Sequence, residues 1–199
     1  MTEINAQEEL AFIKKVMEDS RRLICDDGKS FIFWGILVSF GMLVTYLSVA
    51  GKWIVSLGWF WPVLIAVGWI VTYFISIKDS KKRHSKTFVA KIMGSLWISC
   101  GIAMTILGFI GGLTNAYDGV FISPIICVVL GIGYLVSGVL QGKMWVSLLA
   151  IGWWAGAILM FHLQNLETLL IMFVMMIILQ TIPGFILYNQ SKKELAAVQ

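Results

Sequence analysis

Charged side chains are scarce in this sequence, and they are missing from the places where membrane transport or catalysis most often needs them. The chain has 199 residues with 15 basic and 11 acidic side chains, and none of these stands in the middle of its six long apolar runs. Charges at membrane depth usually mark proton relays, ion sites and coupled transport. Their absence argues against ion-coupled transport. Glu167, at the start of the sixth run, comes closest to an exception.

Cysteine and histidine are also rare, with three and two copies. Cys25, Cys100 and Cys127 do not stand at metal-ligand spacing from one another or from a histidine, which excludes a disulfide framework or a metal site of known spacing. The chain has no nucleophile elbow, P-loop, metalloprotease helix or carboxylate pair. We therefore expect no enzymatic activity, no metal and no cofactor.

Apolar residues, in contrast, are abundant at 59% of the chain, against about 45–50% in soluble domains. They form runs long enough, or nearly so, to cross a hydrocarbon core of about 30 Å. The predicted spans are Phe31–Ala50, Trp53–Ile77, Val89–Leu113, Val120–Leu140, Met144–Phe161 and Leu169–Tyr188. We expect an all-α membrane protein with six transmembrane helices as three hairpins, preceded by a cytoplasmic amphipathic helix. Residues 1–30 would form that helix and its lead-in, 31–188 the bundle and 189–199 a cytoplasmic tail.

The basic residues predict the orientation of these spans. Fourteen of the 15 Lys and Arg residues fall in the segments that share a side with the N-terminus, and only Lys52 falls on the other side. Cytoplasmic loops carry an excess of Lys and Arg. Both termini are therefore predicted to lie in the cytoplasm, in a multi-pass protein of the bacterial inner membrane.

The three hairpins share a pattern that indicates an internal repeat. The second helix of each contains a Pro, a Gly and a Tyr in that order and ends near a Lys. The residues are Pro62, Gly68, Tyr73 and Lys78, then Pro124, Gly133, Tyr134 and Lys143, then Pro183, Gly184, Tyr188 and Lys192. A true repeat would relate the hairpins by an axis along the membrane normal and leave room for a central cavity. The other interpretation is that every membrane hairpin needs such residues.

Residues 5–24 show helical periodicity. One apolar stripe contains Leu10, Ile13, Met17 and Ile24, and acidic and basic residues share the remaining surface. Helices that lie on membranes are typically rich in Lys and Arg, which this one is not. We expect the stripe to dock under the bundle, with a protein partner or second copy and the lipid surface as alternatives.

The connection between the second and third spans is the densest basic segment. It includes Lys81, Lys82, Arg83 and Lys86. Its ordinary role is to hold the topology, and its functional role would be contact with anionic lipid headgroups, at about 1 kcal/mol per cation. Both interpretations stay open. The charge is confined to this segment and the chain ends, so it does not indicate nucleic-acid binding.

A few side chains near or inside the spans are candidates for ligand or interhelical contacts: His162, Gln180, Trp97, Trp153 and Trp154. His162, at the outer end of the fifth span, could belong to a small polar site or a pH-responsive edge, or it could be an interfacial histidine whose tip reaches headgroup water. Gln180 needs an interhelical partner because an unpaired amide in hydrocarbon is costly. The tryptophans stand beside small residues, which is typical of closely packed helices.

Several short segments in the first half of the chain occur in an order that resembles a known group of proteins. The series runs from Ser20-Arg21 through Phe33-Trp34-Gly35 and Trp61-Pro62 to Lys86-Thr87 and Leu96-Trp97. In this series the chain resembles small six-span integral membrane proteins of bacteria that have no assigned activity. The resemblance implies a fold and a location, and no site residues.

These observations predict a non-enzymatic membrane protein that binds or regulates through its bundle and its N-terminal helix. Its partners would be membrane lipids, a second copy or another protein. The alternative is an uncoupled transporter or channel for a neutral or lipophilic solute, which would need a wettable path between the helices.

Overall fold

The computed structural model describes residues 28–82, 88–114 and 116–196, except for the side chains of 79–82, 88, 194 and 195. Several predicted features therefore lie outside the described residues. These are the apolar stripe of Leu10, Ile13, Met17 and Ile24, residues Arg83 and Lys86, and the side chains of Lys81 and Lys82.

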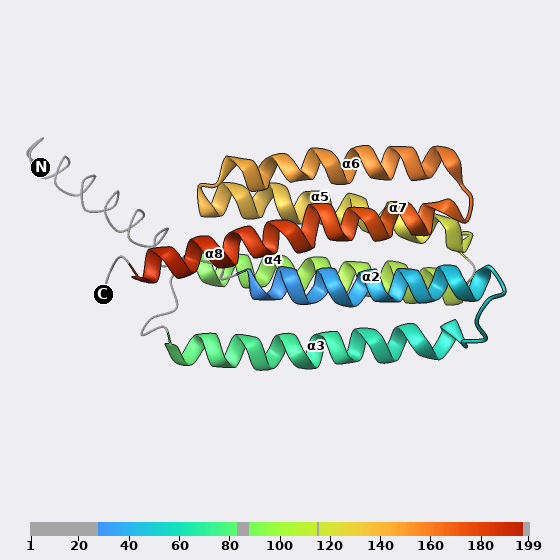
Figure 1. Ribbon diagram of the computed structural model, residues 1–199, viewed down its shortest axis with the longest axis horizontal. Coiled ribbons are helices and arrows are strands. Elements are labelled where there is room, and N and C mark those ends of the chain that lie inside the picture. Colours follow the sequence, from blue (N-terminus) through green and yellow to red (C-terminus); the bar gives the residue numbers. More distant parts are fainter. Residues whose placement is uncertain (1–27, 83–87, 115, 197–199) are drawn as a thin grey trace, which may run out of the picture.

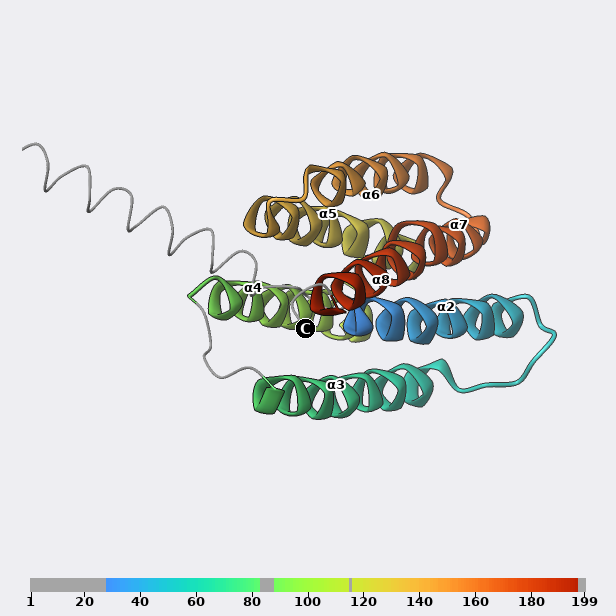
Figure 2. The same cartoon turned by 60° about the vertical axis from the view of Figure 1, so that its left-hand side comes forward.

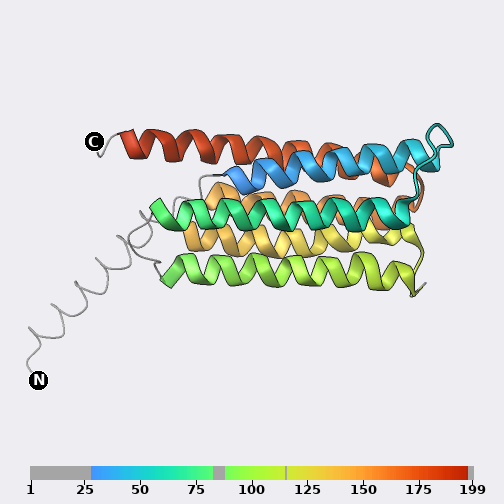
Figure 3. The same cartoon turned by 90° about the horizontal axis from the view of Figure 1, so that it is seen from below.

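Six long rods make up the described part of the chain, and they run along one common axis (Figures 1 and 3). The elements are α2 (Lys29–Val49), α3 (Leu57–Lys82), α4 (Phe88–Thr105) with π-helical η1 (Ile106–Gly111), 3-10 turn η2 (Gly119–Phe121) with α5 (Ile122–Gln141), α6 (Met144–Leu163), and α7 (Glu167–Met175) with π-helical η3 (Met176–Thr181) and α8 (Ile182–Ala196). All six rods are long and apolar enough to cross a membrane. For the described residues, the prediction of a helical fold with six helices long and apolar enough to span a membrane is confirmed.

The two ends of the bundle differ in charge. Helix α2 begins, α8 ends and the α5–α6 turn lies at one end, which we call the basic end (Figure 1). The described parts of this end carry Lys29, Lys78, Lys91, Lys143, Lys192 and Lys193. The opposite end carries Lys52, Asp118 and Glu167. The alternation of the rods thus brings together basic residues that are far apart in the sequence.

The most extensive helix contacts lie between α5 and α6, and between α2 and the last rod (α7, η3 and α8). The α5–α6 turn depends on Gly142, whose φ of 67° lies in the left-handed region that favours glycine. The last rod comes close to α2 at Gly184, where an added methyl group would lie 2.8 Å from the backbone nitrogen of Ile32. The pairs expected from three hairpins also touch, but less extensively. The grouping into three hairpins therefore stays a prediction.

Helices α3 and α4 lie at the periphery of the bundle. Only 6% of the α3 span is buried, compared with 39% of the span that contains α5. Figure 2 shows α3 along one edge of the molecule, with α2 as its main neighbour. The core is therefore built from α2, α5, α6 and the last rod, and it includes the fully buried Tyr134 and Trp153.

Indole rings stacked on glycines fasten the first two predicted hairpins. Trp34 of α2 lies over Gly68 of α3 and donates its N–H to Thr72 Oγ1 at 2.8 Å. Trp97 of α4 lies over Gly133 of α5 and donates to Ser137 Oγ at 3.0 Å. In both cases the glycine gives room for the ring and the hydroxyl four residues later accepts the indole proton.

The third predicted hairpin does not repeat this contact. Trp154 of α6 lies over Gly131 of α5 and donates to the Val128 carbonyl oxygen at 3.3 Å, so its contact points back to the second hairpin. Among the described residues, the first two predicted hairpins thus share this contact and the third does not, and the internal repeat stays a prediction.

Candidate functional site in the bundle interior

Four aromatic rings from four helices meet in the core of the bundle. Tyr134 of α5 lies at the centre, with ring centroids 5.3 Å from Phe31 of α2, 5.8 Å from Trp97 of α4 and 5.8 Å from Trp153 of α6. Phe31 and Trp97 also meet edge to face at 5.3 Å. Aromatic pairs at such distances contribute about 0.5–1.5 kcal/mol beyond their buried area. The cluster therefore ties together helices that do not all contact one another directly.

Trp97 and Trp154 have hydrogen-bond partners, and both contacts are interhelical. The Trp97 N–H is donated to Ser137, whose hydroxyl in turn lies 3.3 Å from Met93 Sδ. Trp154 is only partly buried and reaches the backbone of α5. These two predicted site residues are thus used in holding helices together.

Trp153 differs from Trp97 and Trp154 in its hydrogen bonding. Its side chain is 0% exposed, and its Nε1 finds no hydrogen-bond partner among the described residues. A buried donor that lacks a partner costs about 1–3 kcal/mol. Such a group in a native core calls for an explanation by an unseen water or ligand, or by strain.

Gln180 is the corresponding acceptor. It lies in η3, it is 4% exposed, and its Oε1 has no partner among the described residues. Its neighbour Leu179 faces Gly152 of α6, and Thr181 on its other side faces Gly35 of α2. Because successive residues of a helix point in directions roughly 100° apart, Gln180 lies between these two contacts and faces the interior.

The unpaired donor and acceptor lie at the same depth of the bundle. A methyl group added to Gly152 would lie 3.0 Å from Leu179 Cδ1, so these residues face one another across α6 and η3. Trp153 and Gln180 directly follow them in the sequence. Ser39 of α2, one turn beyond Gly35, adds a third buried oxygen without a partner in the described structure.

The π-helical turn that holds Gln180 has a cause in the sequence. Pro183 follows it and cannot donate a hydrogen bond to the carbonyl of Leu179, and its ring would clash with that carbonyl in a regular α-helix. The wider turn of η3 relieves this clash, and Thr181 reinforces the turn by donating its hydroxyl to the Met176 carbonyl at 3.0 Å. Single π-helical turns are frequent at functional sites.

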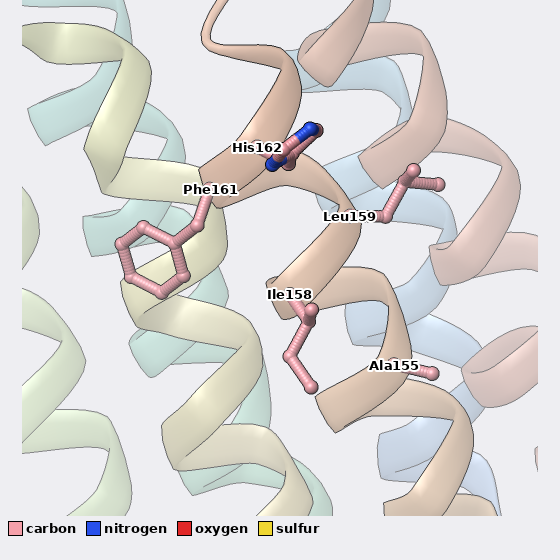
Figure 4. A pocket seen from close by; sticks show the side chains of 5 residues that line it. All are labelled: Ala155, Ile158, Leu159, Phe161 and His162. Carbon is pink, nitrogen blue, oxygen red and sulfur yellow. The ribbon is translucent and has the colours of Figure 1, made fainter.

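His162 stands apart from this interior group. It is exposed at the end of α6 away from the basic end, beside a shallow pocket of about 450 Å³. Figure 4 shows that all the labelled side chains, which are Ala155, Ile158, Leu159, Phe161 and His162, belong to this one helix. The structure therefore does not bring His162 together with Gln180 or the tryptophans.

The polar residues that follow His162 are used in the turn itself. Gln164, at a φ of 47°, donates from Nε2 to the Phe161 carbonyl at 2.8 Å. Asn165 Oδ1 accepts the backbone N–H of Glu167 at 3.0 Å. These contacts end α6 and begin α7.

The sequence did not single out Phe31, Tyr134 or Ser39 as members of the interior site. Tyr134 could have been found from its place between Gly133 and Ser137 in an otherwise apolar span, and Ser39 from its spacing of four from Gly35. In the described part of the chain, no three His, Cys, Asp or Glu residues lie close enough to hold a metal. Comparisons with family models, curated proteins and solved structures found no match.

Proposed function

We propose that this protein is a multi-pass protein of the bacterial inner membrane with both termini in the cytoplasm, related to the small six-span proteins that it resembles. The charge difference between the two ends of the bundle supports this orientation, because Lys and Arg concentrate on the cytoplasmic side. In this arrangement the basic end, where α2 begins and α8 ends, faces the cytoplasm.

We further propose that the protein binds a small neutral molecule in the bundle interior and regulates a partner through its N-terminal segment, without catalysing a reaction. The unpaired Trp153 N–H and Gln180 carbonyl oxygen carry this proposal. A ligand with one acceptor and one donor would satisfy both groups. It would be neutral, because the described side chains of the interior carry no charge to balance an ion.

The position of Gln180 offers a route from this site to the N-terminal segment. Gly184 lies one turn after Gln180 and contacts Gly28 and Ile32 at the start of α2. A change in the turn of η3 would move this contact, because the two backbones are nearly touching there. The start of α2 is also where the chain arrives from residues 1–27, so ligand binding and the position of those residues would be coupled.

The alternative is an uncoupled transporter or channel for a neutral or lipophilic solute. The two π-helical segments, η1 in the third rod and η3 in the last, favour it, because single π-helical turns are frequent at functional sites. Flux of a neutral solute into proteoliposomes, faster than through protein-free vesicles, would support transport.

Native mass spectrometry of the protein released from mild detergent tests the binding proposal. We expect an added mass of a few hundred daltons on the wild type, and its loss in Trp153→Phe and Gln180→Leu. Trp154→Phe, the matched control, removes an indole N–H from the neighbouring position and should keep the added mass.

The thermal stability of the same variants separates the possible results. If a ligand fills the site, Trp153→Phe and Gln180→Leu are less stable than the wild type. If the two groups have no partner at all, the variants are as stable or more stable, because an unpaired polar group has been removed. A bare wild-type monomer with more stable variants would overturn the proposal.

A further inference from the structure

A second set of buried polar atoms without partners lies at the basic end, at the turn between α5 and α6. Gln141, the last residue of α5, is 7% exposed, and neither atom of its amide has a hydrogen-bond partner among the described residues. Lys143, two residues later, has its Nζ buried and likewise without a partner. This set is separate from the Trp153 and Gln180 pair, which lies deeper in the bundle.

A buried ammonium group without an anion is far more costly than an unpaired neutral group. Among the side chains that the structure describes, the carboxylates are those of Asp118 and Glu167, and both lie at the opposite end. The Lys143 ammonium therefore has no counter-ion within the described protein. The amide of Gln141, two residues before Lys143 in the same turn, can donate to an anion as well.

The backbone at this turn also favours an anion. Lys143 is the N-cap residue of the 20-residue helix α6, and no side chain caps the first turn of this helix. Helix N-termini have unpaired N–H groups and a partial positive charge. Ser147, one turn further along α6, donates its hydroxyl to the Leu135 carbonyl of α5 at 3.1 Å, so it does not serve this turn.

We propose that this turn binds the phosphoryl group of an anionic phospholipid, held by Lys143 Nζ and the Gln141 amide. The site lies where two spans end, which is the depth of the headgroups. The exposed side chains next to it are the apolar Val139, Met144 and Leu148, along which acyl chains can lie. A free phosphate shares the headgroup chemistry but makes no use of this apolar surface.

The test uses the full-length protein in nanodiscs of phosphatidylcholine, with or without phosphatidylglycerol. We expect phosphatidylglycerol to raise the thermal unfolding temperature of the wild type, and native mass spectrometry to find a retained anionic lipid. Lys143→Gln should weaken this retention about fivefold, as expected for the loss of one cation near anionic headgroups. Gln141→Leu should weaken it to a smaller degree.

The controls distinguish lipid binding at the α5–α6 turn from general attraction of anionic lipids to the basic end. Lys91→Gln removes an exposed cation from the same end and should keep the retained lipid. Lys143→Arg keeps the charge and should retain lipid even if Lys143→Gln folds poorly. Equal stabilisation of the lipid-free protein by inorganic phosphate would show that the anion is free phosphate, which overturns the lipid assignment.

Two further results would overturn the site as a whole. One is equal loss of lipid in Lys91→Gln and Lys143→Gln, which would mean diffuse attraction to the basic end. The other is a combination of two results: Lys143→Gln loses the same stability in both kinds of nanodisc, and the wild type retains no lipid. Together they would mean that a carboxylate of this chain pairs with Lys143.

Discussion

Helices α3 and α5 have similar length and hydropathy but occupy very different positions in the bundle. Their spans have mean hydropathies of 2.0 and 2.4, yet 6% of the first and 39% of the second are buried. Hydropathy therefore accounts for their presence in a membrane and not for their place in the bundle. Because lipid tails are as apolar as leucine, helix association depends on close packing and hydrogen bonds.

Side-chain size explains the difference. The buried face of α5 contains small residues that include Ser123, Cys127, Gly131 and Gly138, and α6 comes close against it. Helix α3 instead carries large side chains such as Trp59, Val63, Ile70 and Phe74 that point away from the protein. A small-residue face thus marks the central helix, and a face of large apolar residues marks the one that lipid surrounds.

The largest effect is expected from replacing one tyrosine in each of the two helices by alanine. Tyr134→Ala in α5 should lower the free energy of unfolding by about 3 kcal/mol or more, because it leaves a cavity between three aromatic rings. Tyr73→Ala in α3, at a residue that is 65% exposed, should change it by about 0.5 kcal/mol or less. Unfolding in detergent measures both, and equal losses would contradict the assignment of α3 to the periphery.

A smaller effect is expected from adding single methyl groups. Gly138→Ala in α5 should destabilise the protein by about 1–3 kcal/mol, because the new methyl group would overlap Ser147 of α6. Gly94→Ala in the peripheral helix α4 has open space around it and should stabilise the protein by up to about 1 kcal/mol. The same unfolding assay applies, and a stable Gly138→Ala variant would show that α5 and α6 are not closely packed.

The smallest effect tests whether the first two predicted hairpins are equivalent. Trp34→Phe and Trp97→Phe each remove one indole hydrogen bond to a hydroxyl, to Thr72 and Ser137 respectively. Each substitution should lower the free energy of unfolding by about 1 kcal/mol, and the two losses should be similar. If only Trp97→Phe destabilises the protein, the hydrogen bond from Trp34 to Thr72 contributes nothing measurable to stability, and the two predicted hairpins are not equivalent in energy.

Only part of the candidate site could be predicted from the sequence, and the reason is physical. Gln180 and the tryptophans stand out in the sequence because polar or bulky side chains inside apolar runs need partners. Whether those partners exist depends on the packing of other helices. Trp153 and Trp154 are adjacent in the sequence, yet only Trp154 reaches a carbonyl group, because it points to α5 and Trp153 points to the core.

The importance of Lys143 was likewise hidden in the sequence. It counted as one of fourteen basic residues that predict orientation, whereas the denser segment with Lys81 and Lys82 attracted the prediction of lipid contacts. The turn between α5 and α6 buries both the Lys143 Nζ and the Gln141 amide, and neither has a hydrogen-bond partner among the described residues. Burial, and not local charge density, is what makes an unpaired cation costly.

The sequence by itself determined that six helices form and that each is long enough to cross a membrane, because both properties depend on runs of apolar residues. It did not fix every helix end, since the last rod continues to Ala196, eight residues beyond the predicted end at Tyr188. It also supports the prediction of their orientation, through the position of the basic residues. Only the tertiary structure decided which helices are central, which polar atoms lack partners and where Gln180 faces. Those properties depend on contacts between residues that lie 20 or more positions apart, such as Gly152 and Leu179 or Trp97 and Ser137, and an apolar pattern carries no information about such contacts.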